Sequence, residues 1–96
     1  MTQLERIAYY ESLMERLERA VAAAEEAAAP TGEAASLAAE LEAYYAGPEW
    51  REDFDADEAG QLPPGLRRGV LSEDGVWNLL ERVRAIRERG DGSLPS

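Results

Sequence analysis

The chain has 96 residues, close to the smallest size at which one domain builds a hydrophobic core without disulfides or metals. It contains neither cysteine nor histidine, so disulfides, thiol chemistry and imidazole-based catalysis are excluded. The formal net charge of −10 disfavours nucleic acid as a partner, because that affinity comes mainly from neutralised phosphates. The polar N-terminus predicts neither a signal peptide nor a membrane span, and we therefore expect a cytoplasmic protein without membrane contact.

The first predicted element is a long amphipathic helix over residues 3–29. Thr2 is a good N-cap, and Glu5 three residues later completes a capping box. Pro30 cannot continue the helix and therefore ends it. The apolar residues that recur at helical spacing, and so predict one buried face, are Leu4, Ile7, Met14, Leu17, Val21, Ala24 and Ala28.

The second predicted helix covers residues 33–46. Thr31 is placed to cap its start, and the pair Gly47-Pro48 is a typical stop signal at a helix C-terminus. Only a few residues connect the first helix to the second. Because short connections join neighbouring helices, the two are predicted to form an antiparallel helical hairpin.

The second half of the chain is predicted to contain one loop and one helix. Residues 47–71 are expected to form a long ordered loop, because their aromatic, acidic, proline and glycine residues follow neither a helical nor a strand period. Ser72 is a suitable N-cap for a third amphipathic helix over residues 73–89. We expect Trp77 to be buried beside the apolar face of this helix. Residues 91–96 are predicted to be a flexible tail.

These elements predict a single three-helix domain over residues 1–90, of all-α class, in which a helical hairpin and a third helix are joined by the loop. The middle of the chain also resembles a small bacterial family known as domain of unknown function 4298. The resemblance rests on Leu41, Tyr44, Tyr45, Trp50, Asp53, Asp57, Gly60, Leu62, Pro63, Leu66 and the run from Arg68 to Asp74. It extends over nearly the whole chain and implies no activity, ligand or catalytic residue.

The acidic residues of the predicted loop raise the possibility of a metal site. Asp53, Asp55 and Asp57 are spaced like the start of a calcium-binding loop, which also needs glycine at its sixth position and a bidentate Glu at its twelfth. Counting from Asp53 or from Asp55 fails at one or both of these positions. We therefore predict a solvated acidic loop with no metal and no cofactor.

The acidic and basic residues of this segment are also compatible with two further kinds of chemistry. Asp53 and Asp57 would be the acid and base of a small carboxylate-dependent hydrolase, but a chain of this size offers little room for a water-excluding cleft, so catalysis is not expected. Arg67 and Arg68 precede a helix start, where anions bind, yet Glu73 already places negative charge there. We expect one of the two arginines to pair with the acids of the preceding loop instead.

The aromatic residues of the loop allow two interpretations. Trp50 and Phe54 anchor the loop to the helical hairpin, or they form a recognition patch for a protein partner. The overall prediction is a non-catalytic protein-interaction or regulatory module with a partner of unknown identity. Its candidate binding residues are Tyr44, Tyr45, Trp50, Asp53, Asp57 and Arg68.

Two alternatives concern the whole molecule. The acidic chain could mimic the charge of nucleic acid and bind a basic protein. A homo-dimer is also possible, because the small side chains of an alanine-rich helical face permit close packing between copies.

Overall fold

The computed structural model describes residues 1–27 and 32–92, and all regular structure in these ranges is helical. The prediction of an all-α protein is therefore confirmed. The predicted connection at Pro30 and Thr31 lies outside the described residues, as do residues 93–96. The elements are α1 (Gln3–Ala27), α2 (Gly32–Ala46), α3 (Pro48–Glu58), the short 3-10 helix η1 (Gly69–Leu71) and α4 (Glu73–Gly92).

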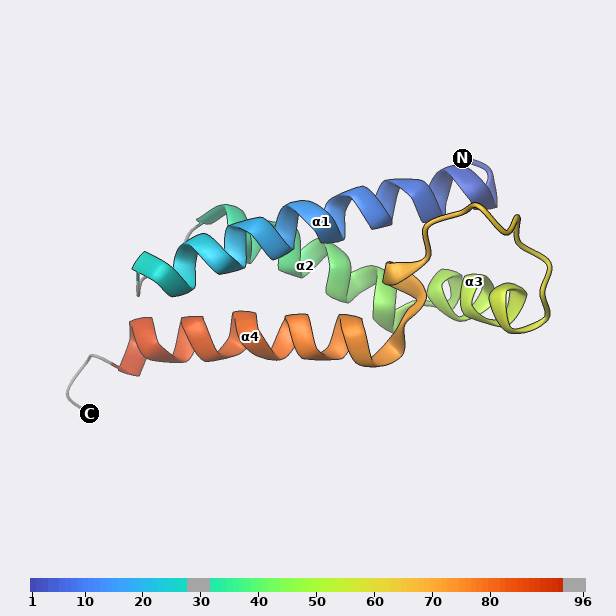
Figure 1. The fold of residues 1–96 in the computed structure, drawn as a ribbon. Coiled ribbons are helices and arrows are strands. Elements are labelled where there is room, and N and C mark those ends of the chain that lie inside the picture. The colour runs from blue at the N-terminus through green and yellow to red at the C-terminus, as the bar shows by residue number, and fades with distance from the viewer. Residues whose placement is uncertain (28–31, 93–96) are drawn as a thin grey trace.

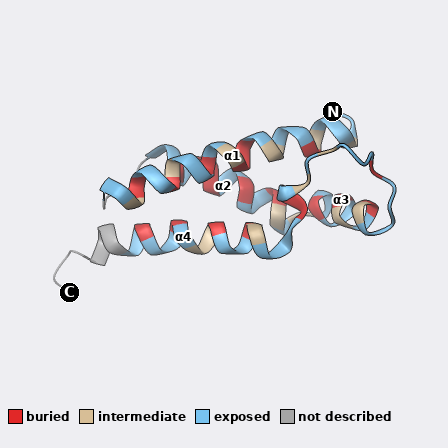
Figure 2. Cartoon of the chain, in the orientation of Figure 1, coloured by how far each residue is buried: buried red, intermediate tan, exposed pale blue. Residues whose placement is uncertain are grey.

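The three longer helices lie side by side along the molecule. In Figure 1, α2 runs antiparallel to both α1 and α4, and the short α3 lies at the end where α1 begins. The turn η1 lies between α3 and the start of α4. The buried residues face inward between these helices, while the outer faces are exposed (Figure 2). Among the described residues, no helix is both long and apolar enough to cross a membrane.

The start of α1 follows the predicted capping box. The Thr2 N–H donates to Glu5 Oε1 at 2.8 Å, and the Glu5 N–H donates to Thr2 Oγ1 at 3.1 Å. The predicted apolar stripe differs at two positions, because Leu4 is 43 % exposed and Leu13, which was not part of the stripe, is buried. The last residue of the predicted stripe, Ala28, lies outside the described residues. The buried residues of α1 are Ile7, Leu13, Met14, Leu17, Val21 and Ala24.

The prediction of an irregular loop over residues 47–71 is wrong for its first half, which is α3. Pro48 occupies the first turn of this helix, where its fixed φ is suitable and its missing N–H would have had no partner. The helix ends in a Schellman motif, in which Gly60 has a φ of 70°. The Gly60 N–H donates to the Asp57 carbonyl at 3.0 Å, and the Gln61 N–H donates to the Ala56 carbonyl at 2.9 Å.

Helix α4 begins at the predicted cap, where the Gly75 N–H donates to Ser72 Oγ at 3.1 Å. It continues to Gly92, beyond the predicted end at residue 89 and into the predicted tail. The expected burial of Trp77 is wrong, since this side chain is 55 % exposed. It follows the buried Val76 by one residue, which turns it about 100° away from the core-facing stripe.

Candidate functional site

A buried carboxylate lies where α1, α2 and α3 meet. Asp53 of α3 is 0 % exposed, and each of its two carboxylate oxygens accepts two hydrogen bonds. Arg6 of α1 donates through Nε to Oδ2 at 2.9 Å and through Nη2 to Oδ1 at 2.5 Å. The Tyr44 hydroxyl of α2 donates to Oδ2 at 2.6 Å, and Gln3 Nε2 donates to Oδ1 at 3.0 Å. These four residues, the Asp53 network, join the three helices.

The charges in the Asp53 network are stabilised by one another. Burial alone raises the pKa of the Asp53 carboxyl, but the hydrogen bonds from Arg6, Tyr44 and Gln3 outweigh it and hold that pKa below its ordinary value. The hydrogen bond to Asp53 likewise raises the pKa of Arg6. Burial, followed by the hydrogen bond to Asp53, raises the pKa of Tyr44. At neutral pH the network therefore contains an ionised carboxylate and an un-ionised phenol.

Aromatic rings enclose this end of the molecule. The ring of Tyr44 stacks on Tyr10 of α1, with centroids 3.8 Å apart and planes inclined by 2°. Trp50 of α3 is buried, and its indole Nε1–H donates to the Val70 carbonyl at 2.9 Å. Phe54 stacks on Trp50 at 5.0 Å between centroids. These contacts favour the interpretation of Trp50 as an anchor, in this case between α3 and η1.

Arg68 holds the segment between α3 and η1 in place through two contacts. One of them is a pairing with an acid of the predicted loop, which the sequence predicted for one of the two arginines. Its Nη1 lies 2.6 Å from Asp57 Oδ1, and its Nη2 donates to the Pro63 carbonyl at 2.8 Å. Arg67 instead pairs with Glu15 of α1 at 2.7 Å. Both arginines are thus paired with carboxylates of the protein itself, just before the start of α4.

The three aspartates of the calcium-like pattern point in different directions, because they lie on a helix and not on a loop. Asp53 faces the core, Asp57 faces Arg68, and Asp55 pairs with Arg51 at 3.5 Å on the outside. In the part of the chain that the structure describes, no group of three acidic side chains is arranged to hold a metal ion.

The six residues predicted to bind a partner thus fall into two groups. Tyr44, Trp50 and Asp53 are buried, so a partner cannot reach them in this conformation. The other three, Tyr45, Asp57 and Arg68, are partly exposed. Sequence reasoning missed the partners that α1 supplies to this end of the molecule, which are Gln3, Arg6 and Glu11.

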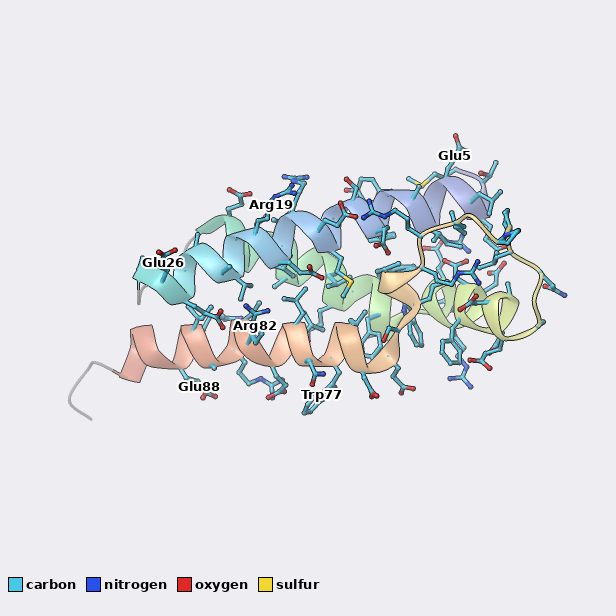
Figure 3. All side chains as sticks on the ribbon, in the orientation of Figure 1. Glu5, Arg19, Glu26, Trp77, Arg82 and Glu88 are labelled. Carbon is cyan, nitrogen blue, oxygen red and sulfur yellow. The ribbon has the colours of Figure 1, made fainter. Side chains whose placement is uncertain are left out.

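A second site, which the sequence did not predict, is an open groove of about 560 Å³ between α2 and α4. Because α2 and α4 run antiparallel (Figure 1), the end of α2 that carries Tyr45 lies beside the start of α4, which carries Trp77. The start of α2, with Ala35, lies toward the part of α4 that carries Glu88. Trp77 projects from α4 on the side away from α1 (Figure 3). The lining residues are Ala35, Ala38, Ala39, Glu42, Tyr45, Ala46, Trp77, Leu80, Glu81, Val83, Arg84, Arg87 and Glu88.

The groove lies along one of three seams between the long helices. Polar contacts bridge the other two seams. The Tyr9 hydroxyl of α1 donates to Glu40 Oε1 of α2 at 2.9 Å, and Arg82 of α4 pairs with Glu25 of α1 at 2.6 Å. Arg82 points from α4 toward α1 in Figure 3. The third seam, between α2 and α4, is the one along which the groove lies, and no ion pair crosses it among the described residues.

The fold and these sites define a small all-α protein with a sealed polar cluster at one end and an open groove along one side. The chain belongs to the family described as "Domain of unknown function (DUF4298)", whose model matches residues 7–89. This confirms the resemblance drawn from the sequence. The matched range includes Asp53 and both walls of the groove, whereas Gln3 and Arg6 precede it. No curated protein and no solved structure matches the chain.

Proposed function

We propose that this chain is a non-catalytic protein-interaction module, and that the groove between α2 and α4 is its binding face. The observation that carries the proposal is Trp77, a large aromatic side chain that is 55 % exposed beside an alanine-lined groove. Tryptophan is among the residues most enriched at the energetic centres of protein interfaces. Tyr45, one of the binding residues predicted from the sequence, lies on the same groove.

The lining of the groove suits a protein partner. The small side chains of Ala35 and Ala39 leave space between the helices, and Leu80 and Trp77 add apolar surface that a partner would remove from water. Charged residues of both signs stand along its rim, as is usual around the apolar centre of an interface. An occupant would therefore gain apolar contacts in the centre and polar contacts at the edge.

The setting of the acidic residues supports binding over catalysis. A general acid needs a raised pKa and access to substrate, whereas the pKa of Asp53 is lowered and its oxygens are sequestered. Several other carboxylates, including Glu15 and Asp57, pair with arginines. A mimic of nucleic acid would need a continuous negative surface, and these arginines interrupt it.

The proposal is tested by affinity capture from the native host with matched baits. Proteins retained by the wild-type chain should be lost with Trp77→Ala and with Ala39→Gln, which places a longer side chain in the groove. Two controls should retain them. Ala43→Gln makes the same change elsewhere on the exposed surface of α2, and Tyr9→Ala removes an aromatic residue of 43 % exposure from α1. Equal capture by all five baits would refute the groove as the binding face.

A further inference from the structure

We infer that the end of the groove at Trp77 binds a basic side chain of a protein partner, with arginine as the best fit. The inference rests on the proposed function, because it needs the groove to be a protein-binding face, and it adds what the partner must present there. It is carried by an exposed indole ring that lies among carboxylates from both walls of the groove.

This end of the groove, here called the aromatic end, is lined by Glu42, Tyr45 and Ala46 of α2 and by Trp77 and Glu81 of α4. These residues come together because α2 runs antiparallel to α4, so that the last turns of α2 lie beside the first turns of α4 (Figure 1). Tyr45 is partly buried, whereas Trp77 is 55 % exposed. A side chain of a partner can therefore reach the indole from solvent.

The charge around Trp77 on α4 is negative. Glu73 and Asp74 precede Trp77 by four and three residues, spacings at which side chains are neighbours on a helix surface. Glu81 follows it by four residues and is a neighbour for the same reason. The charges of Glu73 and Asp74 also reach α2, because burial, followed by these two carboxylates, raises the pKa of the Tyr45 hydroxyl.

The positive charges of the groove lie farther along α4. Arg84 and Arg87 follow Trp77 by about two and about three helical turns, toward the part of α4 that faces the start of α2. Arg84 pairs with Glu81 at 3.1 Å. On the α2 wall, the charged residue of the lining is Glu42. The aromatic end is therefore negative, and the arginines stand at the other end of the groove.

A basic side chain is the occupant that suits both features of the aromatic end. A purely apolar side chain would cover the indole but would bury nearby carboxylates without partners, which costs free energy. An acidic side chain would be repelled. A cation is attracted to the face of an indole ring and pairs with carboxylates at the same time, and the planar guanidinium of arginine is well shaped for both contacts.

The chain already contains one contact of this kind. On the outside of α3, the guanidinium of Arg51 lies 5.5 Å from the centroid of the Phe54 ring and pairs with Asp55 at 3.5 Å. One cation there covers an aromatic ring and neutralises a carboxylate. The aromatic end offers a ring and carboxylates in the same way, and the net charge of −10 would draw a basic partner toward the chain.

The first test selects ligands from a displayed library of random peptides, with the immobilised wild-type chain as bait. The selected peptides should be enriched in arginine or lysine over the unselected library. In the NMR spectrum of the chain they should shift the indole N–H signal of Trp77, which is assigned by its disappearance in Trp77→Leu. The indole of Trp50 is an internal control, because it is buried and donates to the Val70 carbonyl.

The second test measures whether the basic residue of a selected peptide and the aromatic end act on each other. Replacing that residue by an uncharged analogue, citrulline for arginine or acetyl-lysine for lysine, should weaken binding to the wild type at least about fivefold. The same replacement should have little effect on binding to Trp77→Leu or to Glu42→Gln.

Two matched controls should keep the full effect of that replacement. Tyr9→Leu removes an exposed aromatic side chain from α1, and Glu33→Gln removes one charge from an exposed position of α2 outside the groove. Circular dichroism confirms that all four variants keep their helices. Equal effects in Glu42→Gln and Glu33→Gln would mean that only the overall charge of the chain matters, and would overturn the inference.

The inference and the proposed function fail in different ways. Peptides that shift the Trp77 signal but share no basic residue would overturn the inference and leave the groove as the binding face. A wild-type dimer that is lost in Trp77→Leu, detected by light scattering, would do the same, because a second copy would then occupy the groove. Peptides that leave the Trp77 signal unmoved, or the selection of none, would overturn the inference. If all baits also capture host proteins equally, the proposed function is wrong too.

Discussion

Asp53 is the residue on which the closed end of the molecule depends most. A carboxylate without water is stable only when its charge is paired and its oxygens are hydrogen-bonded, and here Arg6, Tyr44 and Gln3 meet both needs. Because the donors come from two helices and the acceptor from a third, the same contacts that stabilise the charge also fix how α1, α2 and α3 meet.

Removing the Asp53 carboxylate should destabilise the protein strongly. Asp53→Ala leaves the largely buried Arg6 without its main partner, and we expect a loss of about 3 to 5 kcal/mol in the free energy of unfolding. Urea denaturation followed by circular dichroism measures this loss. The control is Asp55→Ala, which breaks only an exposed pair with Arg51 and should cost less than about 1 kcal/mol. Similar losses in the two variants would show that the network is not stabilising.

The lowered pKa of Asp53 predicts how stability depends on pH. Its folded-state pKa lies below that of the unfolded chain, so the unfolded state takes up the proton first as the pH falls. The stability that Asp53 contributes is complete above its unfolded pKa of about 3.9 and is lost as the pH falls through the lower folded value. Between about pH 7 and pH 3, the wild type should lose more unfolding free energy than Asp53→Asn. Parallel curves for the two proteins would contradict this expectation.

At the scale of elements, α3 has only a small apolar face. Its position depends mainly on the residues at its two ends and on the contacts of Trp50. Its buried residues are Trp50, Asp53 and Ala56, of which only Trp50 is large and apolar. Pro48 starts the helix and the Schellman motif at Gly60 ends it. The indole of Trp50 then ties the helix to η1 through the Val70 carbonyl.

The end of α3 gives a prediction about one backbone conformation. Gly60 has a φ of 70°, and a Cβ there would meet no atom within 4 Å, so the cost of Gly60→Ala is that of the left-handed backbone alone. We expect about 1 to 2 kcal/mol, measured by urea denaturation. Gly65→Ala is the matched control, because Gly65 is equally open and lacks a positive φ. The assignment of the motif would be wrong if Gly60→Ala were as stable as the wild type.

At the scale of the whole molecule, stability comes from the seams between the three long helices. Leu17 of α1 is 0 % exposed within this core, and Leu17→Ala should cost about 2 to 5 kcal/mol of unfolding free energy. Leu4→Ala removes the same atoms from a position that is 43 % exposed and should cost clearly less. Urea denaturation of the two variants measures both losses. Equal losses would mean that Leu4 belongs to the buried stripe, as the sequence predicted, and would contradict the structure.

Local sequence signals were sufficient wherever the cause is local. The capping box at Thr2 and the cap at Ser72 each act within a few residues, and the structure has both where they were predicted. Among the described residues, the apolar stripe of α1 also follows the prediction apart from Leu4 and Leu13. The pairing of Arg68 with Asp57 was also within reach, because both lie in one segment. Helix α3 was missed although Pro48 and Gly60 flank it, because an inward-facing aspartate does not resemble a core position.

The sequence by itself determined the all-α class, the helix caps and which faces of the long helices are apolar, since propensity and periodicity operate over a turn or two. Only the tertiary structure decided the rest. Arg6 lies 47 residues from Asp53, and nothing between them specifies their contact. The groove between α2 and α4 likewise combines residues that are far apart in the chain, such as Ala39 and Arg84.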